Sequence, residues 1–119
     1  MPEQPVPRVS DADVERVVRR DYATDRIPEV LAMLNEYGQE RWQQEPARVR
    51  LAVLRLAAGN IARLRGEIES AKCDYRDVLA PAEYPNYFKR VSGVGSLPPA
   101  EEQRIIDADW KQYQDWLKR

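Results

Sequence analysis

The sequence predicts an all-α protein made of a single compact domain with about five helices. Apolar residues recur at helical spacing along most of the chain, and helix-capping residues flank these segments. No segment alternates apolar and polar residues as a half-buried strand would. A chain of 119 residues is long enough for one hydrophobic core. We therefore expect a helical domain over residues 10–119, preceded by a flexible arm at residues 1–9.

Two helices are expected in the first third of the chain. Three prolines in residues 1–9 favour an extended arm without helix. Ser10 is a good N-cap for a helix over residues 11–22. Asp25 can cap a second helix, which Gly38 would end.

A central helical hairpin is expected next. Residues 46–58 are apolar on nearly every side except for a narrow exposed stripe at Arg48 and Arg55, which places this helix at the centre of the core. Gly59-Asn60 ends it and caps the following helix, so the two fold back on each other. The apolar spacing of three and four residues predicts that the second helix runs without a break over residues 60–80.

The last third combines a loop and a long helix. Residues 83–98 contain prolines and glycines and predict a long loop held by its aromatic residues. A final helix starts near Pro98 and carries an apolar face wider than one neighbouring helix can cover. Asp109 lies inside this face, so we expect it to pair with an arginine or to lie at the edge.

Composition excludes several classes of chemistry. The chain has no histidine, which removes the commonest general base and metal ligand. Cys73 is the single cysteine, so neither an intramolecular disulfide nor a structural zinc site is expected. We expect no metal and no cofactor.

Charge and hydropathy predict the class of partner and the cellular location of the protein. The net charge is −1, which disfavours nucleic acid as a partner, although residues 41–76 carry an excess of basic groups. The N-terminal residues lack the pattern of a secretory signal, and no apolar stretch is long enough to span a membrane. These features predict a cytoplasmic protein that does not insert into membranes.

One segment resembles known sequences. Residues 60–85 are NIARLRGEIESAKCDYRDVLAPAEYP, and residues 109–117 are DWKQYQDWL. Through the phrases DYRDVL and AEYP, the chain resembles a group of small bacterial all-helical proteins of uncharacterised function. The resemblance covers about two thirds of the chain when the flanking helices are included. It implies a helical fold and transfers no activity or site.

A polar cluster is the first candidate site. Its members are Arg50, Asp74, Asp77 and Glu83. Arg50 shares a helix face with apolar residues, so we expect it to be buried against a carboxylate of Asp21, Asp25, Asp74 or Asp77. Paired carboxylates can perform acid–base chemistry. The favoured role is structural: Asp74 and Asp77 cap or support a kink within their helix and pair with Arg63, Arg65 or Arg76.

An aromatic surface is the second candidate site. Its expected members are Tyr84, Tyr87, Phe88, Trp110, Tyr113 and Trp116. Trp116 is expected at the rim of the last helix's face. The favoured function is therefore a non-catalytic interaction or regulatory module, of the adaptor or immunity type, that binds another protein or itself. The alternatives are nucleic-acid binding through the basic middle third and an enzyme that uses carboxylates without histidine.

Overall fold

The computed structural model describes residues 3–92 and 98–119, and all regular secondary structure in these ranges is helical. Its elements are α1 (Asp11–Asp21), the 3-10 helix η1 (Thr24–Arg26), α2 (Ile27–Leu34), α3 (Pro46–Ala57), α4 (Ile61–Cys73), α5 (Arg76–Glu83), α6 (Pro85–Ser92) and α7 (Pro99–Lys118). The all-α prediction is confirmed, with seven α-helices in these ranges where about five were expected. None of these helices is both long and apolar enough to cross a membrane.

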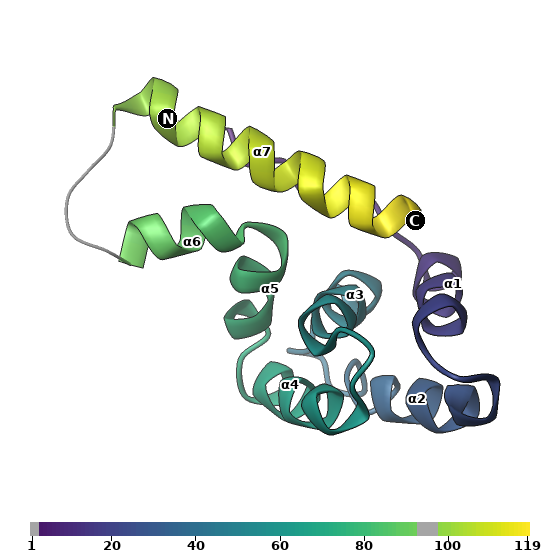
Figure 1. Ribbon diagram of the computed structural model, residues 1–119. Helices are drawn as coiled ribbons and strands as arrows, with labels where there is room; N and C mark the ends of the chain where they lie inside the picture. The colour runs from purple at the N-terminus through teal and green to yellow at the C-terminus, as the bar shows by residue number, and fades with distance from the viewer. Residues whose placement is uncertain (1–2, 93–97) are drawn as a thin grey trace.

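The central helix is α3, which packs against α1, α4 and α5 (Figure 1). Its nearly all-apolar surface explains this position, because every side that contacts a neighbour buries an apolar side chain. The buried residues of α3 are Val49, Leu51, Ala52, Val53, Leu54 and Ala57. The expected hairpin is formed by α3 and α4, where Asn60 caps α4 by accepting the N–H of Arg63 at 2.9 Å.

The second helix is shorter than the sequence predicted. Asp25 lies in η1 and does not cap α2, which starts at Ile27 with Pro28 in its first turn and ends at Leu34. Gly38 still marks a turn, since its φ is 105°. Tyr37 remains buried beyond the helix end because its hydroxyl donates to the carbonyl of Gln44 at 2.8 Å.

The prediction of one unbroken helix over residues 60–80 was wrong. Asp74 is extended, with φ −158°, and separates α4 from α5. Its carboxylate accepts the backbone N–H of Arg76 at 3.0 Å, a local bond that competes with helix continuation. Pro81 lies inside α5, which runs on to Glu83.

The loop expected over residues 83–98 is helical at residues 85–92, whereas Tyr84 and Pro98 lie outside the helices. Residues 85–92 form α6, with Pro85 at its start, where proline's missing N–H costs nothing. Residues 93–97 lie outside the described ranges.

The N-terminal residues are extended and lie beside α7 (Figure 1). Glu3 and Gln103 exchange two hydrogen bonds between the main chain and the side-chain amide, at 2.7 and 3.0 Å. Further along, Tyr84 donates its hydroxyl to the carbonyl of Pro5, and Pro7 is buried. The arm therefore ties α5 to α7.

The molecule is elongated, with extents of 48 × 29 × 23 Å. Its radius of gyration of 14.8 Å exceeds the roughly 13.5 Å typical of a domain of this length. Figure 1 shows why, because α6 and the first half of α7 reach beyond the body formed by α1 to α5.

Candidate functional site

The six aromatic residues of the expected surface separate into two groups. Tyr84, Tyr113 and Trp116 are buried, Trp116 to 8% exposure, so a partner cannot reach them without opening the fold. Phe88 is 41% exposed, and Tyr87 and Trp110 are half-buried. The candidate surface therefore consists of Tyr87 and Phe88 on α6 and Trp110 on α7.

Trp116 is buried because arginines cover it. The guanidinium carbons of Arg20 and Arg55 lie 5.3 and 5.8 Å from its ring centre, within range of a cation–π interaction. Arg20 also donates to the Trp116 carbonyl at 2.7 Å, and Arg16 donates to the Leu117 carbonyl at 2.6 Å. These cations stabilise the negative end of the α7 dipole and hold it against α1.

Asp109 joins α7 to α6. Its carboxylate is fully buried and accepts the backbone N–H groups of Asn86 and Tyr87 at 3.1 and 2.9 Å. It also accepts the Asn86 side-chain amide at 2.8 Å. The expectation that Asp109 pairs with an arginine or lies at an edge was wrong, because the free N–H groups at the start of α6 satisfy the charge.

The four residues of the polar cluster do not form one site, because they contact different partners. Glu83 is 3% exposed in its side chain and binds Arg48 through two hydrogen bonds of 2.7 Å each. These hydrogen bonds, which Arg48 donates to the Glu83 carboxylate, raise the pKa of the Arg48 guanidinium. This bidentate pair joins the end of α5 to the start of α3, so Arg48 does not form the exposed stripe that was expected.

The other carboxylates of the cluster lie near the α4–α5 junction. Asp74 binds the Arg76 guanidinium at 2.8 and 3.0 Å, and this contact lowers the pKa of Asp74. Asp77 is exposed in the first turn of α5. A general acid at neutral pH needs a raised pKa, so the direction found at Asp74 does not favour acid–base chemistry there.

Arg50 is held by main-chain carbonyls. It donates to the carbonyl of Leu34, at the end of α2, at 3.1 Å and to the carbonyl of Tyr37, beyond that end, at 2.6 Å. Among the described residues, the one carboxylate within ion-pair distance of Arg50 is that of the exposed Asp11, at 3.8 Å. The expected partner from Asp21, Asp25, Asp74 or Asp77 was wrong, since the unpaired carbonyls at a helix end accept from a guanidinium equally well.

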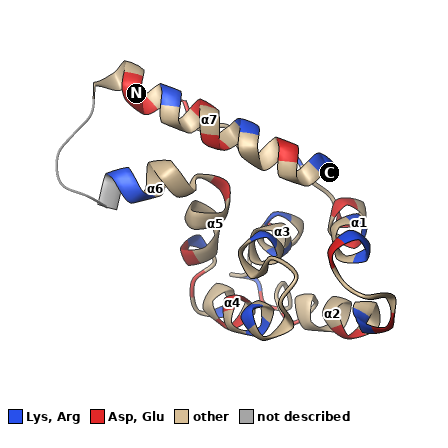
Figure 2. Cartoon of the chain, in the orientation of Figure 1, with Lys and Arg blue, Asp and Glu red and all other residues tan. Residues whose placement is uncertain are grey.

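The basic middle third does not form one cationic face. Arg48 and Arg50 are turned into the contacts above, and Arg55 donates to the carbonyl of Ala82 at 2.7 Å. On α4, Arg65 pairs with Glu36 at 2.8 Å. Figure 2 shows acidic and basic residues interspersed along α1, α4 and α7. A stripe of unneutralised cations, which nucleic-acid binding requires, is not formed by these residues.

The described residues contain no group of three or more His, Cys, Asp or Glu side chains that could hold a metal ion. Comparisons with models of protein families, with curated proteins and with solved structures found no match to this chain. The function must therefore be argued from the geometry of the molecule.

Proposed function

We propose that this protein is a small, non-catalytic interaction module of the adaptor, regulatory or immunity type, and that α6 and residues 99–110 of α7 bind another protein chain. The exposure of Phe88 on a projecting helix carries the proposal. Burying the exposed 41% of this side chain in an interface contributes about 1 kcal/mol, since full burial of such a side chain is worth about 1.5–3 kcal/mol. The half-buried Tyr87 and Trp110 extend the apolar area on the same two helices.

The rigidity of the surface supports the same function. Three hydrogen bonds to Asp109 fix the start of α6 on α7, and the arm fixes α7 through Gln103. A surface that is already ordered loses little conformational entropy when a partner binds.

The charges around Phe88 indicate the chemistry of the partner. Lys89 and Arg90 follow Phe88 on α6 and are both exposed (Figure 2). A partner with apolar side chains at its centre and acidic groups at its rim fits this arrangement. The exposed Cys73, the single cysteine of the chain, suits a reducing compartment such as the cytoplasm.

A pull-down from the protein's own cells tests the proposal through Phe88→Ser. The wild-type chain is expected to retain a stoichiometric protein at high salt, and Phe88→Ser is expected to lose it. Trp42→Ser is the matched control, because Trp42 is 48% exposed and lies on the connection between α2 and α3. It should retain the partner.

Circular dichroism and the thermal midpoint of Phe88→Ser should match those of the wild type, since the removed side chain is exposed. Equal retention by both variants, or no retained protein at all, contradicts the proposal. A concentration-dependent dimer that Phe88→Ser abolishes would replace the second protein with a second copy of this chain.

A further inference from the structure

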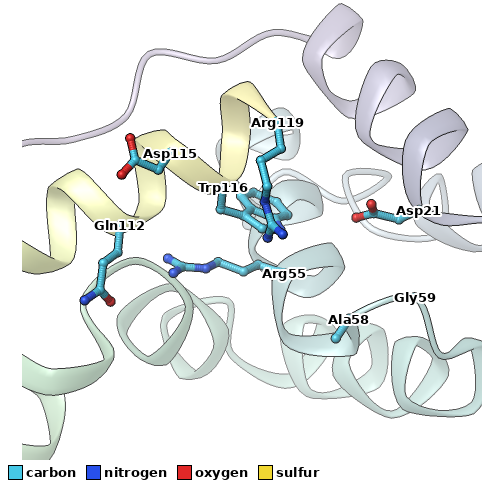
Figure 3. Close-up of a pocket in the computed structure, with 8 residues that line it drawn as sticks. All are labelled: Asp21, Arg55, Ala58, Gly59, Gln112, Asp115, Trp116 and Arg119. Atoms are coloured by element: carbon cyan, nitrogen blue, oxygen red, sulfur yellow. The ribbon is translucent and has the colours of Figure 1, made fainter.

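A pocket of about 720 Å³ opens where the ends of three helices meet (Figure 3). It lies between the last residues of α3, the last turns of α7 and the end of α1. Ligand pockets typically measure about 300–1,000 Å³. This pocket lies away from α6, so it is separate from the proposed protein-binding surface.

The lining of the pocket carries two arginines, Arg55 and Arg119, and two aspartates, Asp21 and Asp115. The half-buried guanidinium of Arg55 donates one hydrogen bond, to Ala82, and forms no ion pair within residues 3–92 and 98–119. The ring centres of Tyr113 and Trp116 lie 5.5 and 5.8 Å from the guanidinium carbon of Arg55. Burial lowers the pKa of the Arg55 guanidinium, and the charge of Arg119 lowers it further. Most of its five N–H donors remain available to a ligand.

The nearby carboxylates are already engaged or turned away. Asp21 accepts two hydrogen bonds from Arg20, at 2.8 and 3.1 Å. Asp109 is held by the start of α6. Asp115 lines the pocket, but its side chain points away from Arg55 in Figure 3. None of these three carboxylates forms an ion pair with Arg55, although the charge of buried Asp109 partly offsets the effect of burial on the Arg55 pKa.

We infer that this pocket binds the carboxylate or phosphate group of a small organic anion, with Arg55 as its anchor. The planar guanidinium can donate two parallel hydrogen bonds to such a group. Arg119 supplies a second positive charge, and Gln112 places a side-chain amide on the same wall (Figure 3). The volume leaves room for an organic part beyond the charged group.

Nuclear magnetic resonance titration of the full chain tests this inference, with succinate and glycerol phosphate as probes and sodium chloride at matched ionic strength as the reference. The Arg55 side-chain N–H and the Trp116 indole N–H signals should shift and saturate with at least one probe and not with chloride. Saturation with succinate alone assigns a carboxylate ligand, and saturation with glycerol phosphate alone assigns a phosphate ligand.

Variants identify the anchor. Arg55→Gln is expected to weaken binding at least about tenfold, the effect of losing one charged hydrogen bond. Arg119→Gln changes an exposed side chain, so it keeps the fold and should also weaken binding. Arg63→Gln, an exposed position on α4, is the matched control and should bind as the wild type does.

Three results would overturn the inference. The first is the absence of any saturable shift at Arg55. The second is a linear shift of equal size at Arg55 and Arg63, which indicates general ionic attraction. The third is wild-type affinity in both Arg55→Gln and Arg119→Gln.

Discussion

At the scale of single residues, arginine side chains connect the helices. Arg48 binds a carboxylate on α5, Arg50 binds carbonyls at the end of α2, and Arg55 stacks beside the aromatic rings of α7. Each contact uses the flat, forked guanidinium, which a lysine ammonium cannot reproduce. The preference for arginine in the middle of this chain therefore follows from packing between helices.

Glu83→Gln should lower the free energy of unfolding by about 1.5–3 kcal/mol, because it removes the buried carboxylate and leaves Arg48 only the exposed Glu45, at 2.9 Å. Urea denaturation measures this change. Asp74→Asn is the control, since the Asp74–Arg76 pair is largely exposed and should contribute little. Equal effects of the two substitutions would show that burial does not decide the strength of the Glu83 pair.

Tyr113→Phe should raise the free energy of unfolding by about 1 kcal/mol. The Tyr113 hydroxyl is buried and has no hydrogen-bond partner among the described residues, so its removal relieves a desolvation cost while the ring stays in place. Tyr37→Phe is the matched control and should destabilise, because it removes a bond to Gln44. A loss of stability in Tyr113→Phe would mean that its hydroxyl has a partner.

At the scale of elements, α6 depends on a carboxylate from another helix. Asp109→Ala should cost about 1–3 kcal/mol of stability, because two backbone N–H groups at the start of α6 lose their acceptor. Amide hydrogen exchange should rise within α6 more than within α4. Asp107→Ala, an exposed change two residues earlier on α7, serves as the control. Unchanged exchange in α6 would show that Asp109 does not cap it.

Two glycines should respond in opposite directions to alanine. Gly66 lies inside α4 with nothing within 4 Å of an added Cβ, so Gly66→Ala should stabilise by about 0.5–1 kcal/mol. Gly38 has φ 105°, and its added Cβ would lie 3.0 Å from Arg50. Gly38→Ala should therefore destabilise, and denaturation midpoints measure both changes. Stabilisation by Gly38→Ala would contradict this account of the turn.

The sequence predicted best the helices that carry their own signals. Ser10, Pro46 and Pro99 mark the starts of α1, α3 and α7, and a local apolar pattern defines each of them. The start of α6 was missed because its acceptor, Asp109, lies 23 residues away from Asn86. The break at Asp74 was missed because the apolar spacing continues across it, and only a side-chain bond to Arg76 reveals it.

At the scale of the whole molecule, the candidate site was only partly predictable. Helical spacing placed Trp110, Tyr113 and Trp116 on one apolar face, but spacing cannot tell which part of a face a neighbour covers. The structure covers Tyr113 and Trp116 and leaves Trp110 half-buried, because the body packs mainly under the last two turns of α7. Arg55 gave one weak signal, because it is one of three arginines in a mostly apolar helix.

Stability should fall between pH 10 and pH 12. Burial raises the pKa of Tyr22, Tyr37 and Tyr84 from 10.0 to about 12. The folded state therefore keeps protons that the unfolded state releases in this range, so this contribution is complete below pH 10 and is lost as pH rises through 12. Urea midpoints measured across the range test the loss, and Tyr37→Phe should reduce its slope. A flat profile would contradict the burial of these phenols.

The contact between α1 and the end of α7 bears on the order of folding. Arg16 and Arg20 bind carbonyls 101 and 96 residues away, whereas α3 and α4 are adjacent in the chain. Closing a long loop costs more entropy than closing a short one, so distant contacts form late. During synthesis, the body from α1 to α5 can form before α7 emerges. Tyr113 and Trp116 therefore complete the core only after the last turn of α7 has left the ribosome.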